Sequence, residues 1–148
     1  LSHERPDLRI GREQIRWNAT SDSDPNLAYL PLMRTDISVR SRQYDKTLII
    51  DTKFYKDTFG KWWDKESIHS AHLYQLFAYL KNLEPKGGAD AQADGMLLYP
   101  VVERSVNFEY HLEKHLLTVR TLNLAAHWSD IRKELLDIVP LDFAYAAA

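Results

Sequence analysis

The most constraining feature of the sequence is an apolar run that ends in charged residues, "TLIIDTKFY" at residues 47–55. Its length and its β-branched and aromatic residues predict a buried β-strand. Side chains alternate between the two faces of a strand, so Ile49, Asp51 and Lys53 share one face. A core strand that carries a carboxylate and an ammonium group on the same face needs a chemical reason for both.

The segment before this strand predicts its partner. In "RTDISVRS" (34–41), Ile37 and Val39 alternate with Asp36 and Ser38, which is the period of a second strand. With "RQYDK" as the turn, residues 34–55 form an antiparallel hairpin, and a turn centred on residues 43 and 44 places Asp36 opposite Asp51. Facing carboxylates repel each other, so the pair favours a bound cation, most simply a divalent metal ion.

The rest of the chain predicts one mixed sheet with helices packed on it. Composition agrees, because 148 residues with 45% hydrophobic content are enough for a single domain with a core. The expected elements are an extended segment at 8–17, a turn-rich loop at 18–26, a polar aromatic loop at 56–66, a helix at 67–83 capped by Ser67 and ended by "EPKGG", strands at 94–102, 106–112 and 116–124, and a helix at 127–139. The fold class is therefore α/β.

Several functions are excluded or disfavoured. The chain has no cysteine, which removes disulfides and thiolate zinc sites and favours a reducing, cytoplasmic setting. No apolar stretch approaches the roughly 20 residues that span a bilayer, so no membrane association is expected. Because the chain starts at Leu1 rather than Met, we expect it to be part of a longer protein.

The two aspartates and the lysine suggest phosphodiester hydrolysis. Mg²⁺ prefers oxygen ligands, and Asp36, Asp51 and the main-chain carbonyl of Thr52 could supply them, with Mn²⁺ as a substitute. Lys53, next to such a metal, could orient or deprotonate an attacking water and screen the phosphate charge. The alternative interpretation is a solvated charge pair at the end of a strand.

Four stretches in order, "LPLMRTDISVRS", "LIIDTKFYK", "HLYQLFAYL" and "LLYPVV", resemble the PD-(D/E)xK nuclease superfamily, in the version with an added Gln-x-x-x-Tyr on the following helix. Within it, residues 27–140 are similar to the McrC family, the nuclease subunits of GTP-dependent restriction systems directed at modified DNA. The resemblance implies a restriction-endonuclease-like mixed sheet flanked by helices over residues 1–148.

The resemblance also implies roles for individual residues. Asp36 and Asp51 would bind metal, Lys53 would be catalytic, and Gln75 and Tyr79 would support the site or contact DNA. The substrate would be double-stranded DNA in the prokaryotic cytoplasm, as part of antiviral defence. The partner would be a McrB-type GTP-hydrolysing AAA+ motor, since "EPKGGAD" is not a phosphate-binding loop and nucleotide hydrolysis must come from elsewhere.

Three points stay open at the level of sequence. Related nucleases often carry an upstream acidic residue on a helix, and we assign neither Glu4 nor Glu13 to that position; that helix is expected before Leu1. The same motifs would fit a RecB-like exonuclease, or a module that only binds nucleic acid or a protein partner. Tyr79 could be an ordinary core residue and Gln75 a surface one.

Two further groups of side chains have ordinary interpretations that we favour. His69 and His72 are expected to be structural or exposed to solvent rather than metal ligands. Phe59, Trp62 and Trp63 are interleaved with lysines and could touch DNA, but they could equally pack on the domain or face another subunit.

Overall fold

The computed structural model describes residues 4–41, 43–54, 68, 70–101 and 105–139. The strands are β1 (Leu8–Gly11), β2 (Gln14–Ile15), β3 (Met33–Arg34), β4 (Ile37–Ser41), β5 (Lys46–Thr52), β6 (Asp94–Val101), β7 (Asn107–Leu112) and β8 (His115–Asn123). The helices are α2 (Ser70–Leu83), the short 3-10 helix η1 (Glu84–Lys86), α3 (Gly88–Ala91) and α4 (Trp128–Asp137).

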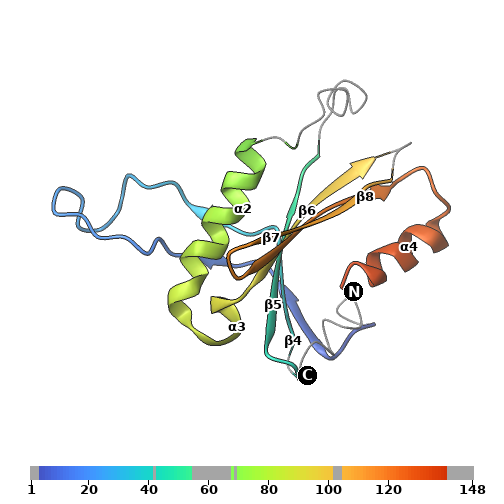
Figure 1. The fold of residues 1–148 in the computed structure, drawn as a ribbon, viewed down its shortest axis with the longest axis horizontal. Coiled ribbons are helices and arrows are strands. Elements are labelled where there is room, and N and C mark those ends of the chain that lie inside the picture. Colours follow the sequence, from blue (N-terminus) through green and yellow to red (C-terminus); the bar gives the residue numbers. More distant parts are fainter. Residues whose placement is uncertain (1–3, 42, 55–67, 69, 102–104, 140–148) are drawn as a thin grey trace.

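Six strands form one mixed sheet in the order β1-β4-β5-β6-β8-β7. The central strands β5, β6 and β8 are parallel, and antiparallel strands complete both sides. Helix α2 covers one face of the sheet and α4 the other (Figure 1). This mixed sheet flanked by helices is the fold class that the sequence predicts.

The predicted hairpin and its register are confirmed. Ile37 faces Ile50 and Ser38 faces Ile49, which is the pairing expected from a turn centred on residues 43 and 44. The two faces are also as expected, because Ile49 packs under α2 whereas Leu48 and Ile50 pack under α4. Strand β5 ends at Thr52 rather than Tyr55, although the Lys53 amide still donates to the Leu98 carbonyl at 3.0 Å.

The extended segment at 8–17 divides into two strands that belong to different sheets. Leu8 is buried on the α4 side and Ile15 on the α2 side, so the chain must change direction between them. β1 joins the edge of the large sheet, while β2 pairs with β3 in a separate two-stranded sheet. Residues 16–32 connect β2 to β3, and most of this connection projects from the body as an arm (Figure 1).

The remaining elements follow the predicted order with small differences at their ends. Helix α2 begins at Ser70, and the expected cap Ser67 lies outside the described residues. "EPKGG" does end α2, with Gly87 at φ 70° and Gly88 at φ 57°, a region open to glycine without strain. The short helix α3 occupies what the sequence suggests is a plain linker. No helix in the described part of the chain is long and apolar enough to span a membrane.

Candidate nuclease site

The candidate site lies at the ends of β4 and β5, on the side of the sheet that α2 covers. Asp36 immediately precedes β4, and its Oδ2 accepts hydrogen bonds from the amide and the hydroxyl of Thr52, both at 2.8 Å. Because Thr52 lies on β5 directly after Asp51, these bonds fix the Asp36 carboxylate next to the neighbouring strand. The sequence-predicted juxtaposition of Asp36 with the end of β5 is therefore present.

Asp51 is a buried carboxylate, only 3% exposed, near the end of the inner strand β5. Burial raises the pKa of its carboxyl group, the Lys53 ammonium opposes that rise, and the negative charge of Asp36 adds to it. Lys53 Nζ lies 2.6 Å from Asp51 Oδ2 as an ion pair. The same Oδ2 is buried, and Lys53 is its one partner among the described residues.

Lys53, Gln75 and Tyr79 form a chain of hydrogen bonds from β5 to α2. Lys53 Nζ donates to Gln75 Oε1 at 2.6 Å, and Gln75 Nε2 donates to the Tyr79 hydroxyl at 2.8 Å. The Tyr79 hydroxyl in turn donates to the Arg34 carbonyl at 3.2 Å. The directions are fixed by chemistry, because a lysine can only donate and the amide oxygen must therefore face it.

Packing of α2 on the sheet holds this chain in place. Leu76 and Leu80 are fully buried between α2 and the strands, and Tyr79 is 4% exposed. Burial raises the pKa of the Tyr79 hydroxyl, so that it keeps its proton for the Arg34 carbonyl. Gln75 lies at the exposed edge of the helix. Tyr79 is thus a core residue and a hydrogen-bonding residue at the same time, and the two interpretations of its role are compatible.

The donor set fits a hard divalent cation in its chemistry. Asp36 and Asp51 offer carboxylate oxygens, which suit Mg²⁺ as ligands, and the buried Asp51 Oδ2 has no described partner besides Lys53. No group of three or more His, Cys, Asp or Glu side chains able to hold a metal occurs among the described residues. Two carboxylates and the Thr52 carbonyl would therefore leave the other positions to water and phosphate oxygens. The metal roles of these residues stay a prediction.

The two upstream glutamates are held by other side chains. Glu13 accepts from Ser38 and binds Arg40, at 2.9 and 2.8 Å, and Glu4 pairs with Arg132 near α4. Neither set of contacts includes Asp36, Asp51 or Lys53, so both glutamates stay unassigned.

His72 has the structural role that the sequence suggests. His72 is buried, with Nδ1 2.9 Å from the Tyr99 hydroxyl, and is therefore structural. His69, Phe59, Trp62, Trp63 and their neighbouring lysines lie outside the described residues.

Sequence reasoning missed Arg12. Its Nη2 lies 3.9 Å from Asp36 Oδ1, and its side chain is 70% exposed. The pairing that brings it there runs between residues 13–15 and 33–35, on either side of the arm. The alternation of Ile15 with polar neighbours is a signal for it, but the sequence alone predicts only an extended segment at 8–17, without a partner.

A mixed sheet with helices on both faces, which brings two aspartates and a lysine together at the ends of neighbouring strands, is a restriction-endonuclease-like fold. Comparison with known sequences places the chain more narrowly. The profile of the family described as "McrBC 5-methylcytosine restriction system component" matches residues 18–100, more than half of the chain. The chain belongs to this family, as its resemblance to McrC predicted.

A relative supports the assignment over a longer stretch. The chain is 41% identical over 127 residues to the type IV methyl-directed restriction enzyme EcoKMcrBC of Escherichia coli strain K12, a match that covers 86% of this chain. It spans only 35% of the length of that relative. The chain is thus a restriction system component that corresponds to about a third of the relative's length.

Proposed function

We propose that this chain is the Mg²⁺-dependent DNA-cleaving domain of a GTP-dependent restriction complex that acts on DNA containing modified cytosine. The observation that carries the proposal is Lys53, held between the buried carboxylate of Asp51 and the amide of Gln75, beside Asp36. Membership in a restriction system family and the name of the relative, a methyl-directed restriction enzyme, support the choice of DNA and of cleavage.

In this proposal Asp36 and Asp51 hold the metal ion, together with the Thr52 carbonyl. The bound ion would supply Lewis-acid stabilisation of the negative charge that develops on the phosphate. The protein prepares the site by burying Asp51 and by fixing Asp36 with two hydrogen bonds from Thr52. The carboxylates therefore need little rearrangement when the ion binds.

Lys53 is the catalytic residue in this proposal. An ammonium group has three N–H donors, and the contacts with Asp51 and Gln75 use at most two of them. At least one donor can reach a phosphate oxygen or the attacking water. A positive charge in that position stabilises the extra charge of the pentacoordinate transition state.

Gln75 and Tyr79 act as positioning residues. Gln75 directs the Lys53 ammonium, Tyr79 fixes the orientation of the Gln75 amide, and the Arg34 carbonyl fixes the Tyr79 hydroxyl. With 4% exposure, Tyr79 is too buried for direct contact with DNA. Partners of this kind that orient groups at the site typically change activity by about 10- to 100-fold when they are removed.

GTP hydrolysis is assigned to a partner, a McrB-type AAA+ motor. The sequence of this chain contains no GxxxxGK[ST] phosphate-binding loop. We therefore expect no GTPase activity from the pure chain and little specific cleavage by it alone.

The experiment is cleavage of methylated and unmethylated plasmid by the wild-type chain and by Asp51→Asn, with and without Mg²⁺, the motor partner and GTP. Cleavage of methylated plasmid is expected only with all components present and only for the wild type. Asp137→Asn is the matched control, because it removes an exposed carboxylate from α4 on the opposite face of the sheet. Undiminished cleavage by Asp51→Asn would contradict the proposal.

A further inference from the structure

The two-stranded sheet of β2 and β3 presents a set of arginines directly beside the candidate site. Gln14 faces Arg34 and Ile15 faces Met33. The pairing continues toward the site, where the Thr35 amide donates to the Glu13 carbonyl at 2.9 Å and the Glu13 amide donates to the Thr35 hydroxyl at 3.0 Å. One step further, Arg12 lies across from Asp36, which explains their 3.9 Å ion pair.

The pairing also continues away from the site, toward the arm. The indole Nε1 of Trp17 donates to the Pro31 carbonyl at 2.7 Å, so a side-chain bond joins the two segments there. Residues 13–15 and 33–35 are thus paired, and together with the flanking residues of 12–17 and 31–36 we call them the arm ribbon. It runs from Asp36 to the base of the projecting arm.

The two faces of the arm ribbon differ sharply in composition. Ile15, Met33 and Thr35 are 1–4% exposed and belong to the face that packs against the body. Since side chains alternate, the outer face carries Gln14 and Arg34, with the exposed Arg12, Arg16 and Leu32 on the flanking residues. Three exposed arginines thus lie along the ribbon, and Arg12 contacts the predicted metal ligand Asp36 at its end.

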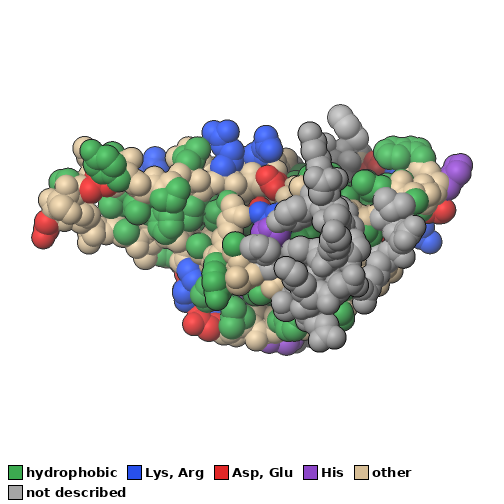
Figure 2. Space-filling model, turned by 90° about the horizontal axis from the view of Figure 1, so that it is seen from above, with side chains coloured by type: hydrophobic (Ala, Val, Ile, Leu, Met, Phe, Trp, Pro, Cys, Tyr) green, Lys and Arg blue, Asp and Glu red, His purple; other side chains and the backbone are tan. Residues whose placement is uncertain are grey.

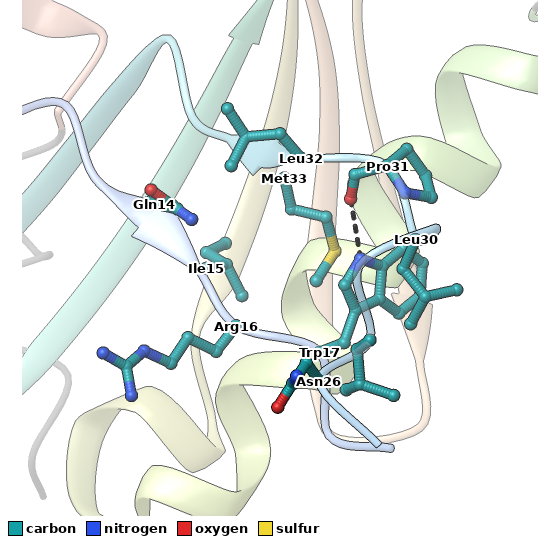
Figure 3. A pocket seen from close by; sticks show the side chains of 10 residues that line it. Gln14, Ile15, Arg16, Trp17, Asn26, Leu30, Pro31, Leu32 and Met33 are labelled. Atoms are coloured by element: carbon teal, nitrogen blue, oxygen red, sulfur yellow. Dashed lines mark hydrogen bonds between the residues drawn. The ribbon is translucent and has the colours of Figure 1, made fainter. Parts of the chain in front are cut away.

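The arginines of the outer face are exposed and available to bind a ligand. Arg16 and Arg34 are exposed and form no ion pair with any residue of the described ranges, and Arg12 is 70% exposed. Arg16 is among the residues that line a cavity of about 360 Å³, and Figure 3 shows its guanidinium on the side away from Trp17 and Leu30. Figure 2 shows Lys and Arg side chains gathered on the surface where the arm joins the body, close to acidic side chains.

Charge indicates the kind of partner. The two carboxylates of the site repel a DNA strand, and the cations that offset this repulsion must lie nearby, outside the metal centre. Arginine binds phosphate through a planar fork of donors, which suits it to a sugar–phosphate backbone. Arg34 is also tied into the site, because its carbonyl accepts the Tyr79 hydrogen bond at 3.2 Å.

We infer that the outer face of the arm ribbon binds the sugar–phosphate backbone of double-stranded DNA and leads it to Asp36. Arg16 and Arg34 bind phosphates away from the cleaved bond. Arg12, next to Asp36, positions the phosphate nearest the site. The inference rests on the proposed nuclease function, but it concerns binding and can be tested without cleavage.

The experiment measures fluorescence anisotropy of a labelled duplex of about 20 base pairs with the chain in EDTA, over a series of salt concentrations. The slope of log K against log salt should shrink by about 0.9 for Arg16→Gln or Arg34→Gln, and by about 1.8 for the double variant. Arg16→Lys with Arg34→Lys should retain most of the slope, because the charges remain. Lys133→Gln is the matched control, since it removes one exposed charge from α4 on the other face.

Equal slopes for Arg16→Gln, Arg34→Gln and Lys133→Gln would overturn the inference. So would the absence of salt-dependent binding by the wild type, or a loss of association with the motor partner while DNA binding is unchanged. Asp51→Asn separates the two proposals, because it should lose cleavage yet keep the wild-type salt slope. The salt dependence of DNA binding therefore tests the arm ribbon, and cleavage by Asp51→Asn tests the nuclease proposal, so either proposal can fail without the other.

Discussion

Lys53 Nζ lies 2.6 Å from Asp51 Oδ2, a buried oxygen that has no partner besides this lysine among the described residues. The lysine thus offsets the charge of the carboxylate, whose oxygens keep further lone pairs for another ligand. This relationship separates the two residues by role, since one can hold a cation and the other cannot. Their substitutions should therefore fail in different ways.

For Asp51, we predict a loss of metal-dependent stability without a loss of stability in the absence of metal. Asp51→Asn removes a buried charge whose desolvation is costly, so it should melt no lower than the wild type in EDTA. A saturating ligand at about 100 times its Kd adds roughly 2.7 kcal/mol to the wild type. Thermal melting across a Mg²⁺ or Mn²⁺ titration should show most of this shift missing in the variant.

Lys53→Ala provides the comparison for that titration. It removes a cation rather than a ligand, so it should keep the metal-dependent shift, and it should reduce cleavage in the reconstituted system by roughly 10²- to 10³-fold. If Asp51→Asn kept the full shift, Asp51 would not be a ligand. The solvated charge pair would then be the better interpretation of residues 51–53.

For Gln75, we predict a loss of activity without a loss of stability. Gln75→Ala removes the acceptor that directs Lys53 and the donor that binds Tyr79, and should lower kcat by about 10- to 100-fold. Because Gln75 lies at the exposed edge of α2, the melting temperature should change little. Tyr74→Ala, which changes a 72% exposed neighbour on the same helix, is the control. Similar cleavage activities of Gln75→Ala and Tyr74→Ala would mean that Gln75 is an ordinary surface residue without a role in positioning Lys53.

The hairpin and the three residues of its site were predictable because each rests on local pattern. A strand period of two fixes which side chains share a face, and a short turn fixes the register, so Ile37 must face Ile50 once the turn is placed. The pairing of Gln75 with Tyr79 follows from helical spacing in the same way. These inferences need no knowledge of distant contacts.

Arg12 was not predictable on the same grounds. Its position depends on pairing between two short strands separated by the arm, and β2 and β3 have two residues each, too few for a periodic signal. The burial of Ile15 and Met33 against α2 decides the pairing, and burial of this kind is a property of the assembled fold. The short helix α3 was not predictable for a related reason, since its four residues after Gly87 are too few to carry a helical pattern.

We predict that the ionised carboxylate of Glu84 stabilises the fold, and that this contribution is lost when the pH falls below 4.5. Hydrogen bonds from Lys81 and then from His115 lower the pKa of Glu84 from 4.5 to about 2. A carboxyl group with a depressed folded-state pKa contributes stability that is fully present above its unfolded pKa and is lost as pH falls through the folded pKa. The contribution should therefore be complete above pH 4.5 and disappear between pH 4.5 and 2.

Urea unfolding of the wild type and Glu84→Gln at several pH values checks this. The difference in the free energy of unfolding should be constant above pH 4.5 and should narrow below it. Glu109→Gln, on the exposed strand β7, controls for the loss of one carboxylate charge. A difference that does not change with pH would mean that the Glu84 carboxylate has no special role.

The last prediction concerns Gly95, which sets how closely α2 approaches the sheet. A Cβ atom at this position of β6 would lie 3.0 Å from side-chain atoms of both Leu76 and Leu117. Overpacking of this kind costs about 1–3 kcal/mol, and Leu76 directly follows Gln75 on the helix. Gly95→Ala should therefore lower the free energy of unfolding by about that amount and also displace Gln75 from Lys53.

Val139→Ala, in the core beneath α4, is the control for destabilisation alone, since it lies on the other face of the sheet. At a temperature where both variants are folded, cleavage should fall further in Gly95→Ala than in Val139→Ala. Equal cleavage by the two variants at that temperature would show that the distance between α2 and the sheet does not control the position of Lys53.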